Sequence, residues 1–564
     1  MLQNQSQIDT RVIVVGAGPV GLSVAIELGL RGIPVVLIEQ RIRTGAQPRA
    51  KTTNVRTMQH LRRWGVADAL RDSAPLPYDY PTDVVFATTL FGRTISVIEN
   101  AFEGAKRRDP RFPEPAQWVP QYTLEKVLHQ RVGELAAVRI ISGMIFEGAK
   151  QTCAGVTATA RDAETGEFLT LRAQYLVGAD GARSRVREVI GAAMVGEHAY
   201  AYNYNVIVRV PELESNPPAR RAIMYWLLNR HSPGVIAPLD RDGVWAFGMM
   251  LPPGVKDIDE ADVVRLVQAA IGRPLHIEIL TADLWAAHRL IADKYRDRCI
   301  FLAGDACHLH PPFGGYGMNL GVGDAVDLGW KLAAVLEGWA EEDLLGSYEA
   351  ERRPVHLRTI AEAVENYKTL SNHLLKDDLD DDTAAGDAAR YALGDEIVAA
   401  KSREFKTLGV VLGSHYANSP IIADEDTALP DEHTSDFQPS ARPGCLAPHA
   451  WLADGSSLYD HFGQGFSLLL LSEQAASAAG EIASVMEEMA VPLKLIDLRH
   501  ADLARLYEAP LALIRPDQYV AWRGAKVDAR ALVDRIRGVA TKTMMRRTRR
   551  EGSGQQHHQR HPDH

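Results

Sequence analysis

The chain has 564 residues, with 72 acidic and 62 basic side chains and a formal net charge of −10. This balance argues against nucleic acid or another polyanion as a partner, and the length predicts two or three domains. Four cysteines without a CxxC pair exclude a disulfide framework. The N-terminus lacks a secretory signal pattern, and no apolar run is long enough to cross a membrane. We therefore expect a reduced, cytoplasmic protein with neither membrane nor nucleic acid partners.

The N-terminal segment predicts a βαβ unit of the kind that binds dinucleotides. Its parts follow one another directly: strand 11–15, then Gly16, Gly18 and Gly21, helix 19–30, strand 33–38 and Glu39. The glycines allow a tight turn, close approach of backbone to a pyrophosphate, and close helix–strand packing. The helix N-terminus then faces the phosphates, and Glu39 stands where it would bind an adenine ribose.

Two more glycine motifs follow, at residues 178–183 (GADGAR) and at Gly304-Asp305 running into 311–319 (PPFGGYGMN). In this order the three motifs are what a chain needs to wrap one FAD from its adenine to its isoalloxazine. No second GxGxxG follows a strand, so one tightly held dinucleotide is expected. This disfavours flavoenzymes that hold two dinucleotides.

The remaining segments alternate in type along the chain. Strands of a mainly antiparallel sheet are expected at 204–210, 222–228 and 243–250. Helices are expected at 361–375 and 388–405, with the acidic run 377–382 as a solvated loop between them. The C-terminal part then predicts strand 466–471, helix 475–488, strand 493–497 and a strand that ends before Pro516.

Residues 175–187 and 303–319 resemble the DG and GD motifs of single-component FAD-dependent aromatic hydroxylases, the group of p-hydroxybenzoate hydroxylase. The resemblance covers roughly residues 10–370. Segments 412–421 and 441–449 look similar to chlorophenol and 3-(3-hydroxyphenyl)propionate hydroxylases.

The resemblance implies an α/β fold: a Rossmann-type FAD-binding domain interleaved with an antiparallel-sheet substrate domain, plus a C-terminal thioredoxin-like domain. The expected boundaries are 1–75, 120–190 and 285–370 for the FAD domain, 76–119 and 191–284 for the substrate domain, 371–439 for a helical linker region, 440–540 for the thioredoxin-like domain and 541–564 for a disordered tail.

The resemblance also implies roles for individual residues in binding FAD. Asp305 would accept hydrogen bonds from ribityl hydroxyls, Gln121 would lie near the ribityl and ring, and Arg49 near the phosphates. A helix beginning near Gly321 would point its positive end at the ring. The full expected cofactor set is Gly16, Gly18, Gly21, Glu39, Arg49, Gln121, Asp180, Arg183, Asp305, Gly315, Met318 and Asn319.

The implied reaction hydroxylates a phenolic ring. NADPH or NADH would visit transiently to reduce a tight, non-covalent FAD, and O₂ would then form a flavin C4a-hydroperoxide that transfers oxygen. Tyr225, Trp226 and Pro312 are the candidate substrate contacts, with Tyr225 hydrogen-bonding the phenol. Ordinary sheet packing is the alternative for Tyr225. The other functions left open are a hydroxylase or epoxidase of a larger polyketide-like or antibiotic substrate, and a flavin-binding scaffold without turnover. A homodimer is also left open.

Two further features favour structural roles. We expect no third ligand near His308 and His310, and the family that the chain resembles uses no metal, so we expect no metal site. Cys445 stands alone beyond residue 400, so the thioredoxin-like domain lacks a redox pair and is expected to be architectural.

Overall fold

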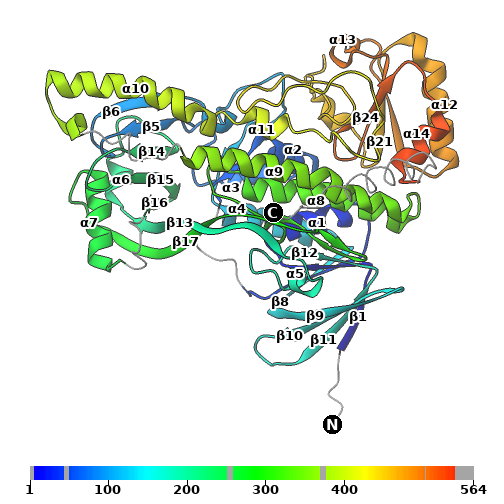
Figure 1. Cartoon of the computed structure of the whole chain (residues 1–564), viewed down its shortest axis with the longest axis horizontal. Coiled ribbons are helices and arrows are strands. Elements are labelled where there is room, and N and C mark those ends of the chain that lie inside the picture. The colour runs from blue at the N-terminus through cyan, green and yellow to red at the C-terminus, as the bar shows by residue number, and fades with distance from the viewer. Residues whose placement is uncertain (1–5, 43–49, 251–257, 369–376, 502, 540–564) are drawn as a thin grey trace, which may run out of the picture.

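The computed structural model describes residues 6–42, 50–250, 258–368, 377–501 and 503–539. Figure 1 shows a central unit of sheets and long helices, a second sheet unit on the left, and the C-terminal unit at the upper right. The expected tail at 541–564 lies outside the described residues.

A six-stranded sheet forms the centre, in the order β18-β19-β12-β2-β3-β8. Its strands are β2 (Val12–Val15), β3 (Val35–Glu39), β8 (Val138–Ser142), β12 (Tyr175–Gly178), β18 (Arg296–Asp297) and β19 (Ile300–Leu302). Strands β19, β12, β2, β3 and β8 pair in parallel. One glycine motif follows each of β2, β12 and β19, which are neighbours. Because parallel strands end at the same edge, all three motifs meet there.

Helices cover this sheet and connect its strands. They are α1 (Pro19–Gly29), α2 (Val55–Arg63), α3 (Ala67–Ser73), α4 (Gln121–Gly133), α5 (Arg185–Val189), α8 (Gly317–Glu337) and α9 (Ser347–Lys368). The predicted βαβ unit is confirmed. Helix α8 begins at Gly317, one turn before the expected Gly321, and its N-cap Tyr316 already has right-handed helical backbone angles. Helix α9 covers the start of the expected helix 361–375, and 369–376 lies outside the described residues.

A second, four-stranded sheet lies beside the N-terminus in the order β1-β11-β10-β9. Its strands are β1 (Ser6–Asp9), β9 (Met144–Thr152), β10 (Gly155–Asp162) and β11 (Phe168–Ala173). The polar sequence of β1 gave no strand signal. It forms by parallel backbone pairing with β11, which depends on residues far along the chain.

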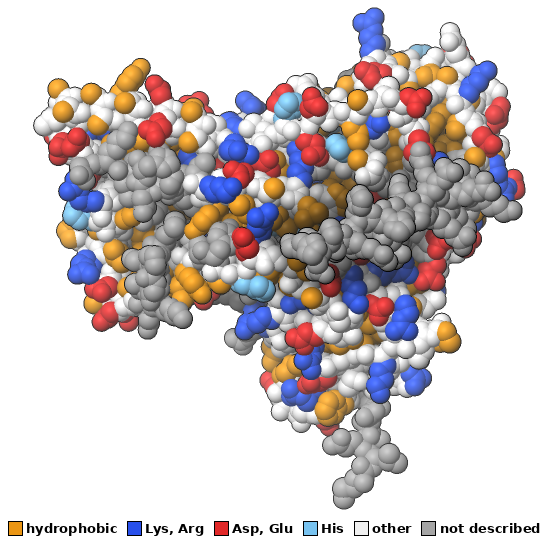
Figure 2. All heavy atoms as spheres, in the orientation of Figure 1, with side chains coloured by type: hydrophobic (Ala, Val, Ile, Leu, Met, Phe, Trp, Pro, Cys, Tyr) orange, Lys and Arg blue, Asp and Glu red, His pale blue; other side chains and the backbone are white. Residues whose placement is uncertain are grey.

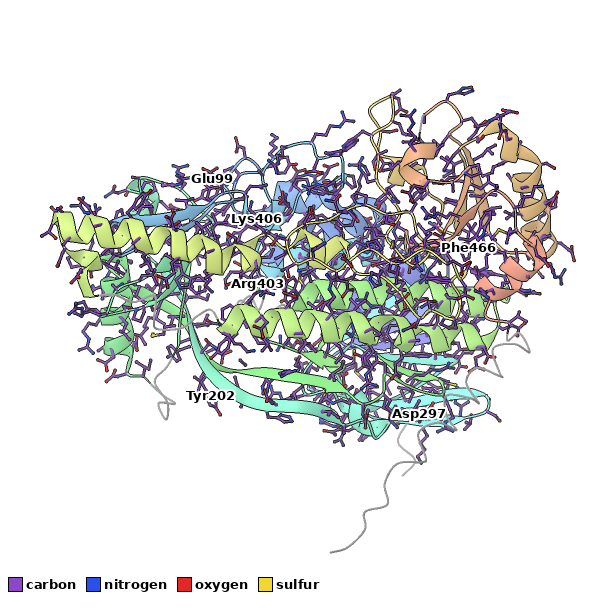
Figure 3. All side chains as sticks on the ribbon, turned by 45° about the horizontal axis from the view of Figure 1, so that its top comes forward. Glu99, Tyr202, Asp297, Arg403, Lys406 and Phe466 are labelled. Carbon is purple, nitrogen blue, oxygen red and sulfur yellow. The ribbon has the colours of Figure 1, made fainter. Side chains whose placement is uncertain are left out.

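The sheet unit on the left in Figure 1 has eight strands in the order β20-β17-β13-β16-β15-β14-β5-β6. Its strands are β5 (Val84–Ala87), β6 (Thr94–Ile98), β13 (Met194–Arg209), β14 (Met224–Leu227), β15 (Gly234–Asp240), β16 (Val244–Met250), β17 (Glu278–Ala292) and β20 (His308–Leu309). The three expected strands coincide with the C-terminal part of β13, with the shorter β14 and with β16. Strand β13 begins earlier than expected and pairs along its length with β17, which the sequence did not predict. Figure 3 labels Tyr202 on this long pair, which connects the sheet unit to the centre.

Two helices cover opposite faces of the eight-stranded sheet. Helix α7 (Glu260–Ile271) contributes Val263 and Val267 to one apolar cluster. Helix α10 (Ala384–Phe405) contributes Leu393 and Phe405 to another. The short elements nearby are β4 (Thr52–Thr53), β7 (Gln117–Trp118), α6 (Glu212–Ser215) and α11 (Leu408–Leu412). The acidic run forms a short, mostly exposed 3-10 turn over Asp377–Asp380.

The C-terminal unit is a four-stranded sheet in the order β22-β21-β23-β24. Its elements are β21 (Phe466–Leu470), α12 (Ala476–Glu488), β22 (Leu493–Asp497), α13 (Ala504–Tyr507), β23 (Leu511–Ile514), β24 (Val520–Gly524) and α14 (Ala529–Ile536). The parallel β21–β22 pair followed by antiparallel strands is the thioredoxin-like arrangement, so the expected fold class is confirmed. Phe466, labelled in Figure 3, packs edge-on against Trp330 of α8 at a ring distance of 6.0 Å.

The surface carries charges of both signs. Figure 2 shows acidic and basic side chains interspersed over the face in view, without a large field of one sign. Among the described helices, none combines the length and the apolar character needed to cross a membrane.

Candidate functional site

In the glycine loop after β2, Gly16 and Gly21 are closely surrounded by other atoms, whereas Gly18 borders an open space. Gly16 has a φ of +101°, and a Cβ there would lie 2.5 Å from the Ala179 oxygen. A Cβ on Gly21 would overlap the Gly16 carbonyl oxygen. At Gly18 no atom of the described residues lies within 4 Å of the Cβ position, and this N-cap of α1 has no side-chain cap. Space beside uncapped N–H groups fits a diphosphate.

Glu39 reaches the glycine loop from the end of β3. Its Oε2 accepts a hydrogen bond from the Ala17 N–H at 2.7 Å, and its Oε1 accepts one from the Arg41 N–H at 2.9 Å. Each carboxylate oxygen keeps a further lone pair. Glu39 can therefore accept a ribose hydroxyl where it lies.

Asp180 shapes the second motif. Its carboxylate accepts from the Ser184 hydroxyl at 2.5 Å and from the Val186 N–H at 3.0 Å, which fixes the start of α5. Burial raises the pKa of Asp180 above its usual value, against the lowering effect of these hydrogen bonds. Arg183 is exposed and makes no hydrogen bond or ion pair with another described residue. Asp180 thus organises the loop, and Arg183 is free to meet a ligand.

The third motif is a tight turn, Gly304–Ala306, with Asp305 at its middle. Gly304 has a φ of +63°, and a Cβ there would lie 2.8 Å from Val20 of α1. A Cβ on Gly321 of α8 would lie 3.1 Å from the Gly304 Cα. The turn is therefore wedged between the glycine-loop helix and α8, so the first and third motifs form one site.

Asn319 ties the start of α8 to the segment that precedes α2. Its Nδ2 donates to the Thr52 oxygen at 2.9 Å and to the Gly315 oxygen at 2.7 Å, and its Oδ1 accepts from the Asn54 N–H at 3.0 Å. Gly314 and Gly315 both have positive φ, +85° and +67°. These contacts fix the backbone at the N-terminal end of α8. Thr52 and Asn54 were not predicted, because their contribution is a main-chain contact with a distant residue.

Gln121 opens α4 and holds the same segment from the other side. Its Oε1 accepts from the Ala50 N–H at 3.1 Å, and its Nε2 donates to Glu125 at 2.7 Å. Met318 packs half-buried against the central apolar core. Arg49 lies outside the described residues.

Lys51 stands between these two anchored positions and was not singled out from the sequence. Its carbonyl accepts from the Val119 N–H at 2.7 Å. The residue is half-buried, and its ammonium group makes no ion pair or hydrogen bond with another described residue. Burial lowers the pKa of Lys51 to about 8. A lysine in this environment can exchange a proton near neutral pH.

Tyr225 and Trp226 face opposite sides of β14. The Tyr225 hydroxyl donates to the Arg220 oxygen at 2.7 Å and accepts from the Ala222 N–H at 3.0 Å, and only 2% of the residue is exposed. Trp226 stacks on Phe86 at 5.8 Å. Both side chains are therefore used in sheet packing, which favours the structural alternative for Tyr225. The third candidate substrate contact, Pro312, is exposed in the loop before α8.

A buried carboxylate lies behind the third motif. Asp324 of α8 accepts from the Gly304 N–H at 3.0 Å and from Arg352 Nε at 2.8 Å. Nε2 of His356 and Nε2 of His308 lie 2.8 Å and 3.2 Å from its oxygens. The sequence offered one signal for this residue: Asp324 follows Gly321 by one helical turn, on the α8 face that touches the Gly304 turn.

The premise that His308 lacks further ligands nearby is wrong. Ligand atoms of Cys307, His308, Asp324 and His356 lie within 4.8 Å of one another, because β20, α8 and α9 converge there. His310 is not part of the group. Arg352 already supplies a positive charge to Asp324, which makes a cation redundant at this position. The absence of a metal stays a prediction.

The C-terminal unit contributes no thiolate. Cys445 is buried, and burial raises the pKa of its thiol to about 11. A protonated, buried thiol is a poor nucleophile.

Comparison with known proteins agrees with this site. Residues 9–363 match the family model of the FAD binding domain, and residues 440–542 match that of the aromatic-ring hydroxylase C-terminal domain. The FAD-dependent monooxygenase apdD of Emericella nidulans is 31% identical over 93% of this chain and 89% of its own. The 4-methyl-5-nitrocatechol 5-monooxygenase of a Burkholderia species is 31% identical over 95% and 99%. The 2,4-dichlorophenol 6-monooxygenase of Cupriavidus pinatubonensis is 29% identical over 94% and 95%.

Solved structures show the same architecture. RebC, soaked with chromopyrrolic acid and containing 7-carboxy-K252c, superposes with a TM-score of 0.88 at 34% identity, over 95% of this chain and all of that one. Aklavinone-11 hydroxylase in complex with FAD and aklavinone gives a TM-score of 0.79 at 28% identity, over 93% and 98%.

The chain therefore belongs to the FAD-dependent aromatic-ring hydroxylases, and FAD is its cofactor. Within that class it has the C-terminal domain of the ring hydroxylases, and the dichlorophenol relative bears out the resemblance to chlorophenol hydroxylases. The crowded and open glycine positions of the first loop fit the cofactor independently of these matches.

Proposed function

We propose that this protein uses NAD(P)H and O₂ to hydroxylate a phenolic aromatic compound. The observation that carries the proposal is the meeting of three glycine motifs at one edge of one sheet, with a single dinucleotide-binding unit in the described chain. One resident FAD leaves the nicotinamide to bind transiently. When bound, FAD supplies the chemistry, accepting a hydride and activating O₂.

The chain's own residues would hold and orient the cofactor. Gly18 and the start of α1 would receive the diphosphate, Glu39 the adenine ribose, and Asp305 the ribityl hydroxyls. The N–H groups at the start of α8, fixed by Asn319, would face the pyrimidine edge of the ring, where negative charge develops on reduction. Arg183 would meet the visiting nicotinamide nucleotide.

Lys51 is the group we assign to the phenol proton. A phenol becomes a better nucleophile as its phenolate, so the site needs a proton acceptor. Lys51 precedes Thr52, whose carbonyl oxygen accepts a hydrogen bond from Asn319 at the start of α8. Its ammonium group makes no hydrogen bond or ion pair with another described residue, and burial lowers its pKa to about 8. Its neutral form can take the proton as the ring reacts.

The first test is a panel of phenols with the purified holoenzyme. We expect NAD(P)H consumption alone to be slow, and the correct phenol to stimulate it with formation of a hydroxylated product. Stimulation that yields only H₂O₂ with every phenol would contradict the proposal.

The second test addresses Lys51. In the wild type the hydroxylation rate should rise with pH through about 8, because the base must be neutral to act. Lys51→Met should remove this limb and lower the rate at least about tenfold. Lys126→Met, at an exposed position on α4, is the matched control. An unchanged pH profile in Lys51→Met would remove Lys51 from this role.

Hydroxylation or epoxidation of a larger polyketide-like or antibiotic substrate is the second candidate. It is favoured by the match of nearly the whole chain to the structures of RebC with 7-carboxy-K252c and of aklavinone-11 hydroxylase with aklavinone. Polycyclic phenols in the same panel decide between the two. A bound flavin that no NAD(P)H reduces would point to the scaffold alternative. The homodimer stays a prediction.

A further inference from the structure

The turn that carries Asp305 is held at both ends by side chains that do not belong to it. At its first residue, the Gly304 N–H donates to Asp324 at 3.0 Å. At its last, the Ala306 oxygen accepts from Arg187 Nη1 at 3.0 Å. Arg187 Nη2 also donates to the Ala182 oxygen, at 2.9 Å, in the second motif. The turn is thus connected to α8 on one side and to the second motif on the other.

Asp324 is fully buried and needs ionised partners to be stable there. Arg352 provides the compensating charge through its Nε. An ionised carboxylate only accepts hydrogen bonds, so Nε2 of His356 and of His308 must carry the hydrogen. The Tyr295 hydroxyl, 2.7 Å from His356 Nδ1, then donates to the remaining ring nitrogen. Every oxygen of Asp324 therefore has two donors.

The two oxygens of the Asp324 carboxylate face different parts of the protein. Oδ2 faces the Gly304 N–H and His308, whereas Oδ1 faces Arg352 and His356. The Arg352 side fixes the carboxylate, and the carboxylate in turn fixes the Gly304 N–H. Val20 of α1 packs beside Gly304, where a Cβ would come within 2.8 Å of it, and this leaves little room for Gly304 to shift toward α1. A displaced carboxylate would therefore displace Asp305, the next residue.

We propose that Asp324 is a positioning residue for FAD: together with Arg187 it clamps the Gly304–Ala306 turn in the conformation that presents Asp305 to the cofactor. This inference concerns FAD affinity and not hydroxylation, so its test is independent of the proposed function.

Asp324→Asn tests the clamp directly. The amide keeps the shape of the side chain, but its NH₂ group must replace one carboxylate oxygen and then faces two hydrogen-bond donors. The substitution also leaves Arg352 without its counter-charge. We expect the FAD dissociation constant, measured by flavin fluorescence titration of the apoprotein, to rise at least about tenfold. Once FAD is saturating, the KM for the aromatic substrate should change less than the FAD dissociation constant does. A general loosening of the fold would change both quantities.

Asp327→Asn is the matched control. Asp327 lies one turn further along α8, is also buried, and makes no contact with the Gly304 turn. Its FAD dissociation constant should stay within about twofold of the wild type. A folded Asp324→Asn with wild-type FAD affinity, or an equal loss of affinity in both variants, would overturn the proposal.

Arg187→Met keeps the proposal testable should Asp324→Asn not fold. Arg187 is half-buried, so its loss leaves no buried charge unpaired, and it severs the other end of the clamp. We expect weaker FAD binding with thermal stability of the apoprotein close to wild type. Unchanged FAD affinity in Arg187→Met would overturn the clamp.

Discussion

Asp324 and Asp327 lie one turn apart on α8, and both are buried, yet they serve different parts of the molecule. Asp324 bonds to the Gly304 turn and to Arg352 and His356 of α9. Asp327 bonds to Lys331 at 2.8 Å and to Arg515 of the C-terminal unit at 3.0 Å. The direct partners of Asp324 all lie in the FAD-binding domain, whereas those of Asp327 include a residue of the C-terminal unit.

The pKa values of the two carboxyl groups are also shifted in opposite directions. Burial alone would raise both pKa values. Around Asp324, His356 and Arg352 outweigh burial and hold the pKa well below its usual range. Around Asp327, Glu351 competes for the same cations, with Arg515 at 2.7 Å and Lys331 at 2.6 Å, and the pKa stays well above its usual range. One helix thus uses an ionised carboxylate to fix a cofactor turn and a shared charge cluster to dock a domain.

The largest effect should come from removing Arg515. Arg515→Leu leaves Glu351 and Asp517 buried without their shared cation, and it should lower the free energy of unfolding by about 3–5 kcal/mol. Denaturant unfolding of the holoenzyme measures this. FAD affinity of the folded fraction should change little, because the Gly304 turn is not touched.

The matched control for this variant is Arg530→Leu. Arg530 pairs with Glu488 on the surface, where ion pairs contribute little. We expect no measurable change there. A similar stability in both variants would show that the Arg515 cluster does not hold the C-terminal unit.

The next effect is a pH dependence that comes from the Asp324 cluster. Burial lowers the pKa of His356 to about 3 from 6.5. Between these pH values the unfolded chain holds a proton that the folded chain lacks, so stability falls as the pH falls. The contribution from His356 is about 2 kcal/mol between pH 6.5 and pH 5. His356→Gln should reduce the loss seen by urea unfolding, and an identical pH dependence in the variant would contradict the buried, neutral histidine.

A smaller effect is expected at the turn itself. Asp305→Ala removes hydrogen bonds to the ribityl chain and should weaken FAD binding by about 1 kcal/mol or somewhat more, roughly fivefold to tenfold. Equilibrium dialysis of FAD gives the answer, and unchanged affinity would take Asp305 out of the site.

The smallest effect should come from Cys445→Ser. Its thiol is buried and protonated, and no other cysteine lies beyond residue 400. We expect the ratio of product formed to NAD(P)H consumed to be unchanged. Loss of turnover with FAD still bound would show that the C-terminal unit takes part in the chemistry.

The FAD motifs could be predicted because local sequence encodes them. Gly16 and Gly21 are required by backbone contacts, and Glu39 follows a strand at a fixed spacing. The Asp324 cluster could not be predicted in the same way. Its partners come from three elements, and nothing in the sequence near Asp324 indicates that Arg352 will neutralise it.

The substrate contacts and the sheet of the substrate domain are even less predictable from the sequence. Tyr225 and Trp226 are candidate substrate contacts by sequence, with sheet packing as the alternative for Tyr225, and in the structure α7 and α10 cover both faces of their sheet. Strand β17 was missed because its pairing with β13 is long-range and its sequence is mixed. Tertiary packing, and not local propensity, decides both.

The central claim is that FAD and O₂ together oxygenate an aromatic ring in this protein. The most direct measurement is turnover of the holoenzyme with NAD(P)H, a stimulating phenol and heavy-isotope O₂, followed by mass spectrometry of the product. The account predicts one oxygen atom from O₂ in the new hydroxyl group and about tenfold or greater stimulation of NAD(P)H consumption by the phenol. A product oxygen derived from water, or protein that cannot be reconstituted with FAD, would contradict it.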